Sequence, residues 1–102
     1  MAKPIDQSER EVARWITLDA LYHGSGYPVS ERLIHSVLEA VPVRSSAADV
    51  RAHFAYLESA GLATVRRLAD GTQTATITRA GVDVVEYNSD CPPGIARPVK
   101  YW

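Results

Sequence analysis

With 102 residues, 46% of them hydrophobic, the chain is long enough for one domain with one core and too short for two. No apolar run approaches the roughly 20 residues that a membrane-spanning helix needs, and the start lacks the apolar stretch of a signal peptide, so we expect a cytoplasmic protein. The net charge of −1 is unevenly spread, because only residues 44–79 are net basic, at +2; this is short of the strongly basic face of a dedicated nucleic-acid binder.

Two helices are predicted before Pro42. The first runs from Gln7 to about His23, where apolar residues recur at three- and four-residue intervals, and the glycines at 24 and 26 end it. Its predicted buried stripe consists of Val12, Trp15, Ile16, Ala20 and Leu21. Ser30 is a good N-cap for the second helix. The apolar face of that helix consists of Leu33, Ile34, Val37 and Leu38.

A third helix is predicted to begin at Ser46, whose hydroxyl can cap the amide of Asp49 while the acid suits the helix dipole. Gly61 is the expected left-handed residue beyond the helix, and Leu62 can fold back on the helix end. The buried stripe of this helix consists of Val50, Phe54 and Leu57. The first half of the chain therefore follows the order helix, helix, turn, helix.

Two runs at residues 63–68 and 72–78 are rich in threonine, valine and isoleucine and predict a β-hairpin, because Asp70-Gly71 joins them. A loop of residues 69–71 gives both strands consistent faces. One face then carries Ala63, Val65, Ala75 and Ile77. The opposite face carries Thr64, Arg66, Thr74 and Thr76.

After the hairpin, Thr78 can cap a short fourth helix that contains Val82, although its β-branched residues make it a weak helix former. The remaining residues are rich in proline, which excludes regular structure and predicts an extended tail. We therefore expect an α+β, mainly helical domain at residues 1–87 and an extended, proline-rich C-terminal tail at residues 88–102.

Four segments carry a family resemblance: residues 49–62, 66–67, 70–71 and 76–81. Together they resemble the winged helix-turn-helix domains of bacterial transcriptional regulators, where a Leu-x-x-x-Gly-Leu step leads from the third helix into the wing. Residues 57–62 read Leu-Glu-Ser-Ala-Gly-Leu, one residue offset from the commonest form, and residues 77–81 match the end of the wing. The resemblance covers about residues 7–87. It implies a three-helix helix-turn-helix core, a β-hairpin wing, a short C-terminal helix and an extended tail.

The tail segment Pro93-Gly94-Ile95-Ala96-Arg97-Pro98 is also similar to the small winged-helix proteins of Mu-like phages and prophages. Those proteins are mostly of unassigned function. This second resemblance therefore implies a phage or prophage context, for a regulator or an accessory factor, without implying a mechanism.

The family resemblance implies that the third helix lies in the major groove of double-stranded DNA while the wing contacts the backbone. Candidate DNA-binding residues are Arg44, Ser45, Ser46, Arg51, Ala52, Tyr56, Arg66, Arg67 and Thr74. Among them, Arg51 has the bidentate fork suited to guanine, and the group at the start of the helix suits a phosphate. A solvated helix face for Arg51 and a soluble hairpin edge for Arg66 and Arg67 are the alternatives.

Winged-helix regulators often dimerise through the first helix and the C-terminal segment, so the resemblance also implies a homodimer. Aromatic residues are the candidate contacts with a partner. They are Trp15, Tyr22, Tyr87, Tyr101 and Trp102. The sequence leaves open whether the tail docks on its own domain or on the partner subunit.

Nothing in the sequence pairs a nucleophile with a base at recognisable spacing, so we expect no enzyme activity and no small-molecule substrate. A single cysteine, Cys91, excludes an internal disulfide and a paired-cysteine zinc site. The three histidines lack metal-ligand spacing and are expected at the surface or at helix ends; they are His23, His35 and His53. We expect neither a metal nor a cofactor.

The chief alternative function is a winged-helix adaptor that binds another protein and not DNA, since the net charge is near zero and the third helix is rich in alanine. The two functions predict different surfaces. A DNA binder requires a continuous positive surface over Arg44, Arg51, Arg66 and Arg67. An adaptor requires an exposed apolar patch over Ala48, Ala52, Ala55 and Tyr56.

Overall fold

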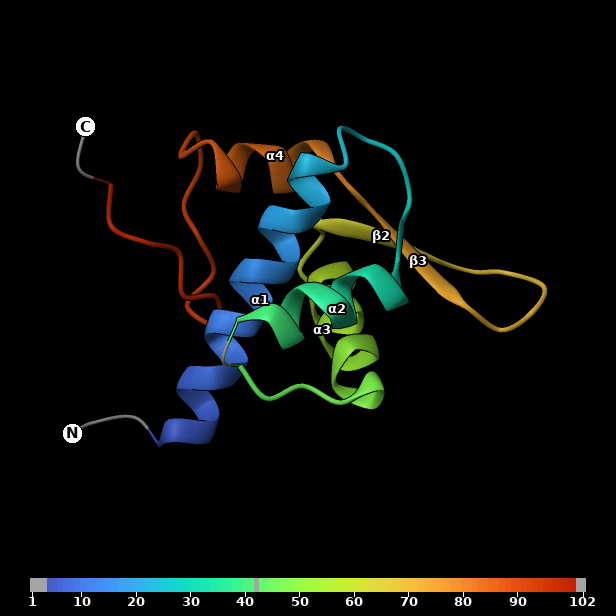
Figure 1. Cartoon of the computed structure of the whole chain (residues 1–102). Coiled ribbons are helices and arrows are strands. Elements are labelled where there is room, and N and C mark those ends of the chain that lie inside the picture. The colour runs from blue at the N-terminus through green and yellow to red at the C-terminus, as the bar shows by residue number, and fades with distance from the viewer. Residues whose placement is uncertain (1–3, 42, 101–102) are drawn as a thin grey trace.

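The computed structural model describes residues 4–41 and 43–100, which form four helices and a three-stranded antiparallel sheet (Figure 1). In chain order the elements are α1 (Ile5–His23), β1 (Val29–Ser30), α2 (Glu31–Ala40), α3 (Ala47–Ser59), β2 (Ala63–Arg67), β3 (Gln73–Ile77) and α4 (Arg79–Val85). The predicted α+β class is confirmed, and about half of the chain is helical. Within the described ranges, no helix has both the length and the apolar character needed to cross a bilayer.

Three of the four helices begin at the caps predicted from the sequence. The Ser30 hydroxyl accepts an amide hydrogen bond in the first turn of α2. At the start of α3, Ser46 and Asp49 each accept a hydrogen bond from the other's amide, which completes a capping box. Thr78 caps α4 by accepting from the amide of Gly81 at 3.1 Å. Caps of this kind contribute about 1 kcal/mol each, so local chemistry sets these boundaries.

The hairpin of β2 and β3 has the predicted loop. The amide of Leu68 donates to the carbonyl oxygen of Thr72 at 2.8 Å, which leaves residues 69–71 as the loop. Gly71 has a φ of +87°, a conformation that glycine adopts without strain. The apolar face of both strands points to the core and the threonine and arginine face points outward, as the alternation predicted.

The third strand, β1, is absent from the sequence prediction. Val29 lies opposite Ala75 and Ser30 lies opposite Thr74, so the strand order is β1-β3-β2. Two residues are too few to show an alternating pattern. Pairing with β3 is what makes this segment a strand.

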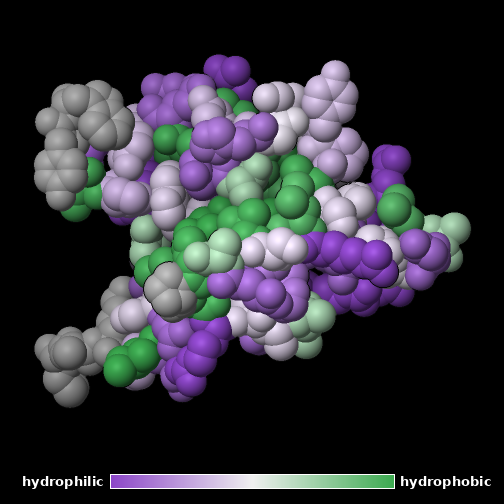
Figure 2. All heavy atoms as spheres, in the orientation of Figure 1, coloured by the Kyte–Doolittle hydropathy of each residue, from purple (hydrophilic) through white to green (hydrophobic). Residues whose placement is uncertain are grey.

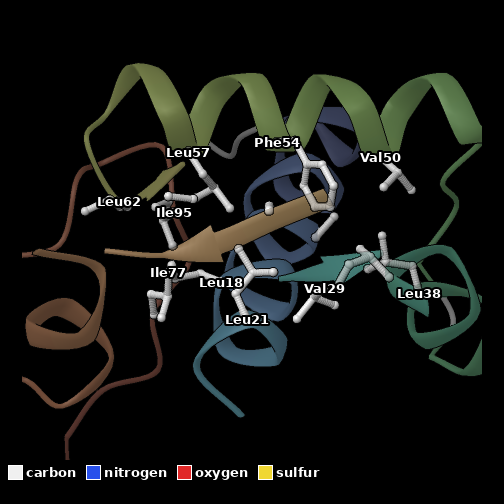
Figure 3. Packing of buried hydrophobic residues seen from close by; sticks show 14 of the residues in the cluster. Leu18, Leu21, Val29, Leu38, Val50, Phe54, Leu57, Leu62, Ile77 and Ile95 are labelled. Atoms are coloured by element: carbon white, nitrogen blue, oxygen red, sulfur yellow. The ribbon is translucent and has the colours of Figure 1, made fainter. Parts of the chain in front are cut away.

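The core lies where α1, α2 and α3 meet the inner face of the sheet (Figure 3). The predicted stripe on α3, formed by Val50, Phe54 and Leu57, is buried, and Phe54 is the largest fully buried residue of the core. The other fully buried members of the core include Leu18, Leu21, Ile34, Leu38, Val50 and Leu57.

The predicted stripe on α1 is wrong in part. Val12 is exposed, and three of its other members are only partly buried. The positions that are buried on α1 are Glu11, Ala13, Thr17, Leu18 and Leu21. Because α1 contacts α2, α3, α4 and β3, its neighbours decide which arc is covered. The arc includes the polar Thr17, whose hydroxyl donates to the Ala13 carbonyl at 2.7 Å.

The C-terminal segment folds back onto the domain. Residues 88–100 form no helix or strand, yet Ile95 is buried in the core. The amide of Ala96 donates to a carbonyl of α1 at 3.1 Å, and Arg97 Nη1 donates to two backbone carbonyls at 2.9 Å. Residues 88–100 therefore pack against their own domain. Tyr101 and Trp102, at the end of the tail, lie outside the described residues.

Candidate nucleic-acid interface

Helix α3 buries one side and exposes the other. The exposed side is a ridge of small side chains, formed by Ala48, Ala52 and Ala55, and we call it the alanine ridge. These methyl groups offer no hydrogen-bond donor or acceptor. Arg51 is the one long basic side chain that the same stretch of α3 carries next to them.

Arg51 is held by its own chain. Its Nε donates to Glu31 Oε1 at 2.9 Å, and its Nη2 donates to Glu31 Oε2 at 3.1 Å and to the Gly71 carbonyl at 2.9 Å. Glu31 also accepts a hydrogen bond from the amide of Gln73. These bonds tie α3 to the start of α2 and to the hairpin. The hydrogen bonds from Arg51 hold the pKa of Glu31 below its ordinary value, so the carboxylate stays charged at neutral pH.

Carboxylates of this chain lie where a phosphate was expected at the start of α3. The amide of Arg44 donates to Glu9 Oε2 at 3.2 Å, and Nη2 of the Arg44 side chain donates to Glu9 Oε1 at 2.7 Å. The amide of Ser46 donates to the Asp49 carboxylate at 2.8 Å, and the carbonyl of Ser45 accepts from an imidazole at 3.1 Å. Arg44 and the amide of Ser46, which were expected to bind a phosphate, are therefore engaged within the chain, whereas the buried hydroxyl of Ser45 has no hydrogen-bond partner among the described residues.

The two hairpin arginines point to opposite faces. Arg66 lies opposite Thr74 on the outer face, whereas Arg67, one residue further along, points to the inner side near α3. Among the described residues, neither arginine has an ion pair. Glu58, which would repel a phosphate, instead accepts from the amide of Val65 at 3.1 Å and so covers the free edge of β2.

An open cleft lies between the start of α2, helix α3 and the tip of the hairpin. It is lined by Glu31, Arg32, Arg51, Arg67, Asp70, Gly71 and Thr72. Three arginines face two carboxylates here, and both carboxylates accept hydrogen bonds from their own chain. The sequence gives no sign of Arg32 at this site, because no local pattern indicates that α2 places it beside the hairpin.

A second cleft lies on the other flank of α3, against α1. Its charged lining is balanced, with three arginines and three carboxylates. They are Arg10, Arg14, Arg44, Asp6, Glu9 and Asp49. The net positive charge beside α3 is therefore on the hairpin side.

His53 is buried, so the prediction of a surface or helix-end histidine is wrong here. Its side chain lies on α3 toward α1 and is 5% exposed. Burial is the main cause that lowers the pKa of His53, and nearby Arg14 lowers it further, while Asp49 acts in the opposite direction. The imidazole is therefore neutral in the folded protein at pH 7.

Acid is expected to destabilise the protein through His53. A lowered pKa means that the folded state binds fewer protons than the unfolded state. The stability that neutral His53 contributes is therefore fully present above about pH 6.5, the unfolded value, and is lost as the pH falls through the folded pKa. Urea unfolding of the native protein between pH 7 and pH 5 measures the loss, at most about 1.4 kcal/mol per pH unit. In His53→Gln this part of the pH dependence should disappear. If the free energy of unfolding of the variant fell with pH as steeply as that of the native protein, His53 would not be its cause.

Tyr56 belongs to the contact with the tail. The guanidinium of Arg14 lies 3.9 Å from the centre of its ring, and Arg14 Nη1 also donates to the Gly94 carbonyl at 3.0 Å. A Cβ at Gly94 would overlap the Tyr56 hydroxyl, so a larger residue there would displace the end of that side chain. Tyr56 is therefore half-buried beside the alanine ridge and does not extend it.

The aromatic residues expected to contact a partner are engaged within the chain where the structure describes them. Trp15 packs against the core, and the hydroxyl of Tyr22 donates to Glu86 at 2.7 Å. Tyr87 donates to the Pro98 carbonyl at 2.7 Å and stacks under a guanidinium. The other two lie outside the described residues; they are Tyr101 and Trp102.

Neither of the two expected surfaces forms in full. Arg44 and Arg51 are ion-paired, which leaves Arg66 and Arg67 as the unpaired half of the expected positive surface. The apolar patch likewise lacks Tyr56. Comparisons with known protein families, with curated proteins and with solved structures found no match to this chain.

Proposed function

We propose that this chain is a winged-helix protein that binds double-stranded DNA, as a regulator or accessory factor in a phage or prophage. Helix α3 would face the major groove and the hairpin would act as the wing on the backbone. One observation carries the proposal: within the described residues, the start of α2 and the hairpin carry three exposed arginines without ion pairs. They are Arg32, Arg66 and Arg67.

The positions of these arginines suit phosphates. Arg32 and Arg67 line the cleft beside α3, and Arg66 lies on the outer face of the hairpin with Thr74 next to it. Each phosphate that a cation neutralises contributes about 0.9 to the slope of affinity against salt concentration on logarithmic axes. Three such contacts support weak, strongly salt-dependent binding. Small alanines on α3 favour the proposal further, because they let the helix approach the groove closely.

Fluorescence anisotropy of a labelled random duplex at two salt concentrations tests the proposal. The single variants Arg66→Ala and Arg67→Ala are each expected to weaken binding several-fold and to reduce the salt slope by about one. Arg79→Ala is the matched control, because it removes the same charge from an exposed arginine on α4. If Arg79→Ala lost as much affinity for the duplex, the loss in the hairpin variants would reflect the change in net charge alone. No binding by the native protein at low salt would refute the proposal.

The second candidate is a protein adaptor. The alanine ridge and the internal pairing of Arg44 and Arg51 favour it, because both reduce the number of groups available to DNA. If the native protein fails to bind any duplex, the alanine ridge becomes the surface on which to search for a protein partner.

A homodimer is part of the proposal. Figure 2 shows hydrophobic side chains gathered over α1 and α2 near the middle of this face, and Val12 and Leu33 on these helices are exposed. Such a surface supports association through the first helices, which would double the number of phosphate contacts. Light scattering in solution measures the mass that decides between monomer and dimer.

A further inference from the structure

We infer that α3 binds DNA without reading its base sequence, because Glu31 holds Arg51, the one side chain beside the alanine ridge that is suited to read a base. Glu31 is thus a specificity-determining residue that acts through Arg51. The inference rests on the proposed DNA-binding function and specifies the kind of DNA recognised: duplex of any sequence, bound through its backbone.

The other residues of α3 offer little for base reading. Bases are distinguished in the major groove by donors and acceptors at their edges, and an alanine can at most contact a thymine methyl group. Asp49, Glu58 and Ser59 of α3 have other partners, in the capping box, at the amide of Val65 and at a carbonyl of the same helix. His53 is buried, and the ring of Tyr56 packs against the guanidinium of Arg14. Recognition by α3 would therefore depend on Arg51.

The hydrogen bonds of Arg51 occupy the donors that a guanine would need. A guanidinium has five N–H groups and presents two edges, both of which include Nη2. The edge formed by Nε and Nη2 is used by Glu31, and the remaining hydrogen of Nη2 is used by the Gly71 carbonyl. Only Nη1 has no partner in the described chain. A single nitrogen cannot make the two-point contact with O6 and N7 of guanine.

The surroundings of Glu31 stabilise its ion pair with Arg51. Its side chain is 13% exposed, and it bridges α2, α3 and the amide of Gln73 on β3. Charge-assisted hydrogen bonds to a carboxylate are stronger than those to the neutral acceptors of a base. Release of Arg51 would also leave a mostly buried carboxylate without its guanidinium, which is costly. A guanine therefore competes poorly for Arg51.

Selection from a duplex library with a randomised central segment, followed by sequencing, tests this inference. The native protein is expected to enrich no base at any position. In Glu31→Ala, where Arg51 is released, we expect about tenfold enrichment of guanine at one position, and Glu31→Ala/Arg51→Ala should lose it. Glu39→Ala is the control, because it removes the same charge from α2 at an exposed site. There Glu39 pairs with His35, so its removal should enrich no base.

The possible outcomes separate the inference from the function on which it rests. A guanine preference in the native protein that Arg51→Ala abolishes would overturn the inference and leave DNA binding intact. No enrichment in a folded Glu31→Ala would overturn the role of Glu31. If that variant unfolds, Glu31→Gln, which keeps the side-chain shape and removes the charge, should show a weaker enrichment of the same base. Failure of the native protein to bind any duplex would refute the function itself.

Discussion

Ile95→Ala is expected to lower the free energy of unfolding by about 2–5 kcal/mol, the usual cost of truncating a large buried aliphatic side chain. Ile95 is 5% exposed although it lies in a segment without helix or strand. Figure 3 places it at the end of the core where Leu57 and Leu62 lie. The segment around it is held by hydrogen bonds from Arg14, Ala96 and Arg97, so the cavity left by truncation cannot close freely.

Urea unfolding followed by circular dichroism measures the effect. The matched control is Val99→Ala, because Val99 lies four residues further along the same tail and is 71% exposed. Its truncation should change the free energy of unfolding by no more than about 0.5 kcal/mol. If the two variants were equally stable, Ile95 would not belong to the core, and the tail would be an appendage of the domain.

Phe54→Ala is expected to lower the free energy of unfolding by about 3–5 kcal/mol. Phe54 is the largest fully buried side chain and lies at the centre of the α3 face that packs against the core. Its loss removes the ring that anchors α3 against α1 and the sheet. Because the proposed DNA contacts depend on the position of α3, the same variant should also lose duplex binding at temperatures where it is partly unfolded.

Tyr27→Ala is the control for this effect, since Tyr27 is an aromatic residue that is 74% exposed in the connection before β1. Thermal unfolding of both variants under one buffer condition gives the comparison. A midpoint for Phe54→Ala close to that of Tyr27→Ala would mean that α3 is anchored by other contacts.

The features that the sequence predicted correctly depend on residues close together in the chain. Caps at Ser30, Ser46 and Thr78 form within the first turn of their own helices. The hairpin loop follows from alternation along two adjoining strands and from a glycine at the left-handed position. By contrast, the buried arc of α1 was partly misplaced, because four elements cover that helix from different sides.

Some features of the candidate site also follow from local sequence, and others depend on distant residues. The exposed alanines of α3 and the positions of Arg66 and Arg67 on the hairpin follow from helical and strand periodicity. The partners of Arg51 and Arg44 do not, since Glu31 is 20 residues away in the chain and Glu9 is 35 residues away. No local pattern indicates such pairs, and they change which arginines are available to a phosphate.

By itself, then, the sequence determined the helices, the caps of three of them, the hairpin with its loop and the absence of regular structure in the proline-rich tail. All of these depend on backbone preferences and hydrogen bonds between near neighbours. Tertiary structure alone decided that residues 88–100 of the tail pack on their own domain, that His53 is buried and that Arg51 is held by Glu31. These three outcomes depend on which elements meet in space, and packing between distant segments sets that.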